Sequence, residues 1–100
     1  MADITVEELK QRMDNHEELN VIDVREEYEY EEFNIGAKLI PLATLPSHLN
    51  ELEDWKDKEV IVHCKSGGRS GSAKLIMQRQ GFTNVRNLIG GMSEWQKKFG

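Results

Sequence analysis

The chain has 100 residues, of which 38% are hydrophobic and 31% are charged, and its formal net charge is −5 at pH 7. This length predicts one domain over residues 1–100, since domains typically run about 50 to 250 residues. No apolar run approaches the roughly 20 residues that span a bilayer, and the N-terminus lacks the basic start and apolar stretch of a secretion signal. These features exclude a membrane-spanning protein. The single cysteine, Cys64, cannot form an internal disulfide, so a reducing, cytoplasmic location is expected.

Charge is unevenly distributed along the chain. Residues 1–59 hold six Lys and Arg against seventeen Asp and Glu, whereas residues 60–100 hold seven against one. Either the acidic and basic surfaces neutralise one another across the fold, or the basic half binds a partner, for which a small anion is the better fit. Nucleic acid is a weaker candidate, because the domain is acidic overall and no aromatic stacking stripe accompanies its basic residues.

Strand and helix patterns alternate along the chain. The periodicity of apolar residues and the turn signals predict, in order, a helix over residues 5–15, a strand over 19–24, a helix over 26–33, a strand over 38–41, a helix over 44–53, a strand over 59–64, a helix from 70 to 80, a strand over 85–88 and a C-terminal helix after 90–91. This alternation predicts an α/β fold with a parallel sheet covered on both faces.

Individual residues mark several of these boundaries. Thr5 begins a capping box at the first helix, and Ser70 is predicted to cap the helix that follows the glycine-containing loop. Gly81 stands where a left-handed residue ends a helix. Tyr28 and Phe33 are predicted to be the buried pair of the acidic second helix.

Cys64 stands where a parallel sheet binds ligands. In such sheets ligands bind beyond the carboxyl ends of the strands, and Cys64 ends the β-branched run over residues 59–64. Loop amides, a helix N-terminus and the charges of Lys65 and Arg69 would all favour its thiolate, which is the reactive form. The alternative is a small hydrophobic residue at the end of a buried strand. The density of anion donors after Cys64 favours the nucleophile.

The loop after Cys64 is predicted to bind an anion. Gly67 and Gly68 permit positive φ angles, which turn several backbone N–H groups toward one point. Arg69 could brace this loop or bind substrate. Lys65 is either a solvated charge or a group that steers anions.

The histidines show no catalytic or metal-binding pattern. His63 precedes Cys64 in a strand, and since strand side chains alternate between faces, it should point away from the cysteine. His16 and His48 lie in polar helical segments and are predicted at the surface. One cysteine and scattered histidines give no metal-ligand spacing, so neither a metal nor a cofactor is expected.

Three motifs in order resemble those of a single-domain rhodanese, a rhodanese-like sulfurtransferase. Asp23-Val24-Arg25 before an acidic helix resembles the family's first signature. Residues 64–70 resemble its active-site loop, and residues 88–95 resemble its C-terminal signature. The resemblance implies a three-layer α/β/α fold with a central parallel five-stranded sheet. It also implies that Asp23 and Arg25 support the site structurally.

The resemblance further implies a covalent sulfur transfer. Cys64 would attack the outer sulfur of thiosulfate, release sulfite and carry a persulfide, which cyanide, a small thiol or a protein cysteine would then accept. The loop residues expected to cradle the negative terminal sulfur are Lys65, Ser66, Gly67, Gly68, Arg69 and Ser70. The expected partners are thus thiosulfate or a polysulfide, one of these acceptors and, in a relay, a second sulfur-relay protein. Neither nucleic acid nor a membrane is an expected partner.

Other functions share parts of this pattern. A cysteine-dependent phosphatase usually has five residues between its cysteine and arginine, whereas four lie between Cys64 and Arg69. The tighter ring suits a persulfide better than a phosphate. A persulfide carrier or docking module needs the same loop as a free enzyme, so the sequence does not separate these two, and the acidic first half could be a docking face. An inactive interaction domain is disfavoured, because Cys64 and its loop are intact.

Overall fold

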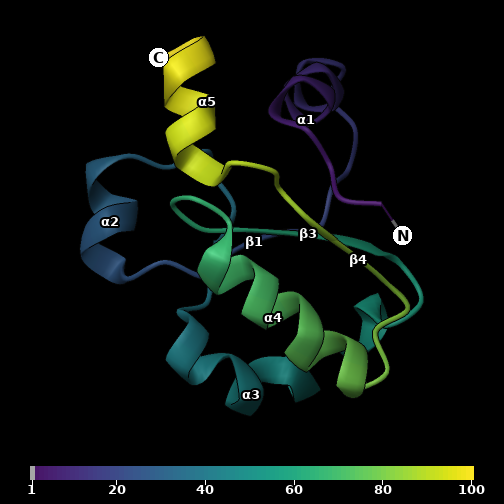
Figure 1. The fold of residues 1–100 in the computed structure, drawn as a ribbon. Helices are drawn as coiled ribbons and strands as arrows, with labels where there is room; N and C mark the ends of the chain where they lie inside the picture. Colours follow the sequence, from purple (N-terminus) through teal and green to yellow (C-terminus); the bar gives the residue numbers. More distant parts are fainter. Residues whose placement is uncertain (1) are drawn as a thin grey trace.

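The computed structural model describes residues 2–100. They contain five α-helices, two 3-10 helices and four strands, joined by loops (Figure 1). In chain order they are α1 (Val6–Asp14), β1 (Val21–Asp23), α2 (Glu27–Glu32), β2 (Lys38–Leu39), η1 (Leu42–Thr44), α3 (Leu45–His48), η2 (Leu49–Trp55), β3 (Glu59–His63), α4 (Gly68–Arg79), β4 (Asn84–Asn87) and α5 (Gly91–Phe99). No helix within residues 2–100 is long and apolar enough to cross a membrane.

The four strands form one parallel sheet in the order β2-β1-β3-β4, which confirms the predicted parallel sheet. Central strand β1 places Ile22 opposite Val62 of β3 and Lys38 of β2. The resemblance implied five strands, whereas the sheet within residues 2–100 has four, and the expected fifth strand is replaced by a single bridge. Ile4 makes only a single parallel bridge, to Leu88 just after β4, because the chain turns into α1 immediately afterwards.

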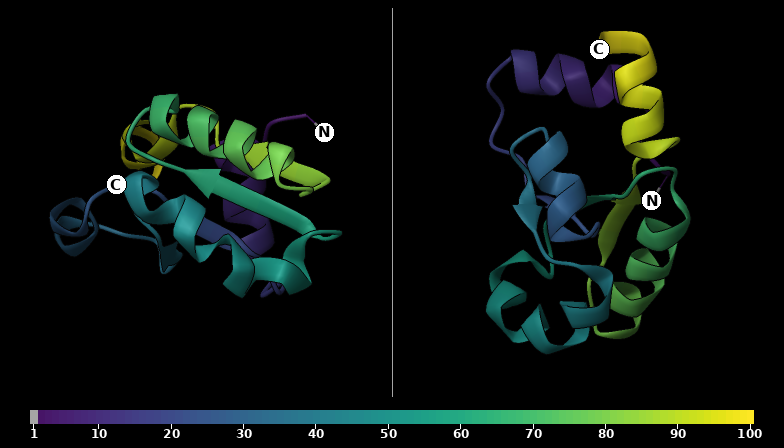
Figure 2. Two further views of the ribbon diagram at one scale, coloured as in Figure 1. Left: turned by 90° about the horizontal axis from the view of Figure 1, so that it is seen from below. Right: turned by 90° about the vertical axis from the view of Figure 1, so that its left-hand side faces the viewer.

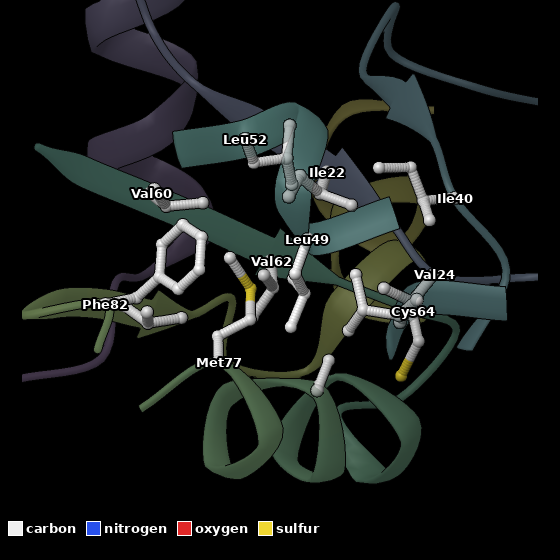
Figure 3. Packing of buried hydrophobic residues seen from close by; sticks show 13 residues of the cluster. Ile22, Val24, Ile40, Leu49, Leu52, Val60, Val62, Cys64, Met77 and Phe82 are labelled. Atoms are coloured by element: carbon white, nitrogen blue, oxygen red, sulfur yellow. The ribbon is translucent and has the colours of Figure 1, made fainter. Parts of the chain in front are cut away.

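The sheet separates two hydrophobic clusters. Because side chains alternate along a strand, Val60 and Val62 of β3 pack with residues of α3, η2 and α4, whereas Ile61 packs with residues of α1 and α5. Figure 2 shows α1 and α5 together on one side of the sheet and α3 and α4 on the other. Figure 3 shows the first of these clusters from close by, with Leu49 and Met77 facing Val62. The predicted three-layer arrangement is confirmed.

The segment predicted as one helix over residues 44–53 is broken into η1, α3 and η2. Pro46 lies in the first turn of α3 and has no N–H to continue a helix begun in η1. Leu52 interrupts η2 with φ −105° and ψ 17°. Leu45, Leu49 and Leu52 are nevertheless all buried, so the apolar spacing identified the core-facing side correctly.

The prediction that Tyr28 is buried is wrong. Tyr28 is 65% exposed, because α2 buries none of its residues and lies at the side of the molecule. Phe33, which ends α2, is half-buried against the cluster formed with α1 and α5.

Ion pairs join the acidic and basic halves of the chain. The pairs that cross between residues 1–59 and 60–100 are Arg69–Glu29, Lys74–Asp3, Arg86–Glu8, Arg86–Glu59 and Lys98–Glu7. These contacts favour mutual neutralisation as the meaning of the charge asymmetry. Lys65 makes no such pair within residues 2–100, so it is the loop cation left available for an anion.

Candidate active site

Cys64 follows the carboxyl end of β3 and lies at the end of the core cluster beside Val24 (Figure 3). The residue is buried, and its sulfur is held by two donors from the following loop. The Gly67 amide donates to Cys64 Sγ at 3.1 Å, and the Ser70 hydroxyl oxygen lies 3.3 Å from Sγ. The sequence-predicted nucleophile and its loop are therefore together.

The loop curls because Gly67 adopts a left-handed conformation with φ 110°, which a residue with a side chain rarely takes. This turn makes Gly67 the N-cap and Gly68 the first residue of α4. The prediction that Ser70 caps the helix is wrong, since Ser70 lies inside the first turn. Its hydroxyl is thereby aimed at the cysteine rather than at the helix end.

These contacts act on the acidity of the thiol. Burial raises the pKa of Cys64, but hydrogen bonds from the Ser70 hydroxyl and from the amides of Ser70, Gly67 and Ser66 outweigh it. The pKa of Cys64 therefore lies below its ordinary value. A thiolate so stabilised is a nucleophile in a largely enclosed site.

The N-terminus of α5 packs directly on the loop that begins at Cys64. The amides of Met92 and Ser93 donate to the carbonyls of Cys64 and Lys65 at 2.9 and 2.8 Å. A Cβ atom on Gly91 would lie 2.5 Å from the Cys64 carbonyl oxygen, and the φ of Gly91 is 55°. Gly91, which belongs to the C-terminal motif, thus permits this close approach.

Asp23 and Arg25 form a buried ion pair next to the site. The Nε and Nη2 atoms of Arg25 donate to the Asp23 carboxylate at 2.8 to 3.1 Å. Arg25 Nη2 also donates to the Phe33 carbonyl at 2.7 Å, which fixes the end of α2. The pair can therefore play the supporting role predicted for it by fixing the position of α2.

Helix α2 in turn holds the first turn of α4. Both Nη atoms of Arg69 donate to the Glu29 carboxylate, at 2.6 and 2.9 Å. This bidentate contact lowers the pKa of Glu29 to about 2. Of the two roles left open for Arg69, bracing the loop is therefore the one its geometry favours.

A depression of about 420 Å³ opens between the loop and α2. Lys65, Tyr28 and Glu32 are among its lining residues, and Arg25 lines it while paired with Asp23. Lys65, the residue after Cys64, thus places an exposed cation at the wall of this depression, where it attracts anions.

Asn87, at the end of β4, belongs to the candidate site, although no sequence motif indicated it. Its Nδ2 donates to the Gly67 carbonyl at 3.1 Å, and its Oδ1 accepts from the Ser70 hydroxyl at 2.6 Å. The available signal was its place at the carboxyl end of a predicted parallel strand neighbouring that of Cys64.

His63 lies on the sheet face opposite Cys64, as predicted. It is fully buried, and neither ring nitrogen has a hydrogen-bond partner within residues 2–100. Its Nε2 is 3.9 Å from Asp23 Oδ2. Burial lowers the pKa of His63 to about 4, against the attraction of the Asp23 carboxylate. His63 is therefore neutral at pH 7 and belongs to the core.

Mild acid is expected to destabilise the fold through His63. The folded pKa is about 4 and the ordinary value is 6.5, so between these pH values the unfolded chain binds the extra proton. Stability therefore falls as the pH drops through this window, by about 2 kcal/mol between pH 7 and pH 5. Urea denaturation measures it, with His63→Phe as the comparison. An unchanged slope in His63→Phe would assign the effect to other groups.

Comparison with known proteins extends these observations. The sequence model described as "Rhodanese-like domain" matches residues 5–98. A Bacillus subtilis (strain 168) protein named "Putative sulfur carrier protein YrkF" is 41% identical over 99 residues, which are 98% of this chain and 52% of that protein. This chain therefore spans about half the length of that relative. A protein of Allochromatium vinosum named "Sulfurtransferase" is 32% identical over 96 residues, covering 95% of this chain and 88% of that protein.

A solved structure agrees in fold. The crystal structure of a rhodanese-like domain protein from Staphylococcus aureus superposes with a TM-score of 0.85 at 32% identity, covering 95% of this chain and 91% of that one. The parallel sheet, the loop that carries Cys64 after β3 and the family match over residues 5–98 all indicate the same fold. The chain belongs to the rhodanese-like domain family.

Proposed function

We propose that this protein is a sulfurtransferase that moves a sulfane sulfur from an anionic donor to a nucleophilic acceptor through a persulfide on Cys64. The observation that carries the proposal is the pair of donors on the Cys64 sulfur, from Gly67 and Ser70, at the N-terminus of α4. The name of the Allochromatium vinosum relative supports the same class of reaction. A reducing, cytoplasmic setting would keep the thiol available between turnovers.

The proposed reaction has two displacements at the transferred sulfur. The Cys64 thiolate attacks the outer sulfur of thiosulfate, a bond forms between the two sulfurs, and sulfite leaves with the electron pair of the broken S–S bond. The negative charge then lies on the outer sulfur of the persulfide, where the loop amides from Lys65 to Ser70 would stabilise it. Cyanide, a thiol or a protein cysteine attacks that sulfur, and the Cys64 thiolate leaves. No external oxidant or reductant is required.

A second candidate is a persulfide carrier that delivers its sulfur only to a docked protein. The name of the Bacillus subtilis relative favours it, and so does the exposed acidic helix α2 beside the loop. The two functions share the loading step and differ in the acceptor. Appreciable turnover with cyanide or a small thiol would identify an enzyme, whereas transfer only to a protein cysteine would identify a carrier.

Loading is tested by intact-mass spectrometry. The reduced protein is incubated with thiosulfate, and separately with polysulfide, and the product is digested to locate any added atom. We expect a gain of one sulfur atom on Cys64. Protein alkylated beforehand at Cys64 is the control and should gain none. The absence of an adduct from both donors would contradict the proposed function.

Lys65→Ala is expected to raise the KM for thiosulfate about two- to fivefold at low ionic strength, the range for one exposed charge pair. The effect should fade with added salt, because an exposed charge is screened. Steady-state kinetics at two salt concentrations measures it, and Lys58→Ala, an exposed lysine before β3, is the control. An unchanged KM at low salt would show that Lys65 does not steer the donor.

A further inference from the structure

The Ser70 hydroxyl lies between two hydrogen-bond acceptors. Its oxygen is 3.3 Å from Cys64 Sγ and 2.6 Å from Asn87 Oδ1. A hydroxyl has one proton to donate, so Ser70 cannot donate to both acceptors at once. Ser70 is fully buried, so its hydroxyl has no access to bulk water, whereas Asn87 is half-buried.

The orientation of Asn87 directs an acceptor at Ser70. Asn87 Nδ2 donates to the Gly67 carbonyl at 3.1 Å, and this contact assigns Oδ1, an acceptor, to the side of Ser70. The Asn87 backbone is held as well, because its N–H donates to Asp3 Oδ1 at 3.0 Å. Asn87 therefore presents a fixed acceptor to Ser70.

The charge on the Cys64 sulfur decides which of the two acceptors receives the Ser70 hydrogen bond. In the neutral thiol, S–H can donate to Ser70 Oγ, and Ser70 can donate to Asn87, so every group is satisfied. In the thiolate no S–H remains. Ser70 must then either turn its proton to Sγ and leave Asn87 Oδ1 without it, or point a lone pair at a negative sulfur.

We propose that Asn87 is a positioning residue that competes with the Cys64 sulfur for the single proton of Ser70. The hydroxyl donates to Sγ while the negative charge is there, and to Asn87 once the charge has left Sγ. The two arrangements differ only by a rotation of the Ser70 hydroxyl hydrogen about the Cβ–Oγ bond, and no heavy atom moves. Asn87 thereby disfavours the thiolate, whereas Ser70 favours it.

In catalysis the same rotation would follow the transferred sulfur, and this step rests on the proposed function. After loading, the charge lies on the outer sulfur, and the Ser70 hydroxyl again donates its hydrogen bond to Asn87. When an acceptor attacks, charge develops again on Sγ as the leaving group, and the proton turns back. Asn87 Oδ1 would thus accept the Ser70 hydrogen bond during the persulfide stage, and Sγ would accept it during discharge.

Opposite shifts in the pH profile of Cys64 test the proposal. The rate of iodoacetamide alkylation is measured against pH, and its midpoint reports the thiolate. Ser70→Ala should raise the midpoint, because a donor to Sγ is lost. Asn87→Ala should lower it, because the competitor is lost. Each shift is expected to be about half to one pH unit, a roughly three- to tenfold change in thiolate population below the midpoint.

Two further variants keep the test decisive. Asn87→Val also removes the amide but favours a strand, so it covers the case in which Asn87→Ala does not fold. Asn84→Ala makes the matched change at the start of β4, away from the loop, and should leave the midpoint unchanged. Thermal unfolding confirms that each variant is folded.

A midpoint that is raised or unchanged in the folded Asn87 variants would overturn the proposal, because Asn87 would then only hold the loop in place. Alkylation needs no sulfur donor, so this result is independent of the loading experiment. If the native protein formed no sulfur adduct, the proposed function would fail, but the alkylation midpoints of the Asn87 variants would still test the competition for the Ser70 proton.

Discussion

Cys64→Ser is expected to abolish sulfur uptake from both thiosulfate and polysulfide while the protein stays folded. A serine hydroxyl is not ionised at neutral pH and forms no S–S bond, so neither the nucleophile nor the persulfide can exist. The fold should survive because serine is close in size to cysteine. Its oxygen can also accept the hydrogen bonds that Sγ accepts from the Gly67 amide and the Ser70 hydroxyl.

Intact mass after incubation with each donor measures this result, and thermal unfolding checks the fold. The expected spectrum of Cys64→Ser shows only the mass of the unmodified chain, alongside a native sample with one added sulfur. An adduct on the folded variant would place the reactive group elsewhere and remove the basis of the proposed function.

Arg25→Ala is expected to lower the free energy of unfolding by about 3 to 5 kcal/mol, the range for removing one partner of a buried ion pair. Asp23 is fully buried, and the substitution leaves its carboxylate without the Arg25 guanidinium at 2.8 Å. The Phe33 carbonyl loses its donor at the same time. Urea denaturation at pH 8 measures the loss.

Lys10→Ala is the matched control for this change. It removes the partner of Asp14 in an exposed pair with the same 2.8 Å separation, and should cost less than about 1 kcal/mol. A cost for Arg25→Ala no larger than this would contradict a structural role for the buried pair.

The penalty of Arg25→Ala should also depend on pH. Burial keeps His63 neutral, and the charge of Arg25 also lowers its pKa, while the nearby Asp23 carboxylate raises it. Without Arg25, protonated His63 can partly neutralise Asp23. The difference in unfolding free energy from the native protein should therefore be smaller at pH 5 than at pH 8.

Much of the fold was predictable because its signals are local. The β-branched run that ends at Cys64 and the alternation of strands and helices indicated a parallel sheet with the cysteine at a ligand-binding edge. Thr5 caps α1 and Gly81 has φ 97°, both as their residue types indicated. These features depend on neighbours along the chain, which the sequence displays directly.

The remaining features depend on contacts between distant residues. Asn87 meets Ser70 across 17 positions, and Glu29 meets Arg69 across 40, so no local pattern marks either pair. The left-handed turn at Gly67 starts α4 earlier than the position of Ser70 suggested. Tyr28 has the character of a core residue, but its helix finds no layer to pack against.

Transfer through Cys64 is tested most directly by following the outer sulfur of thiosulfate with an isotopic label. The protein is loaded, freed from donor by gel filtration, and mixed with cyanide, a small thiol or a thiol-containing protein. We expect the adduct mass to disappear as the label passes to the acceptor in a one-to-one ratio, leaving unmodified Cys64. An adduct that persists with every nucleophile would be a dead-end modification and would contradict sulfur transfer through Cys64.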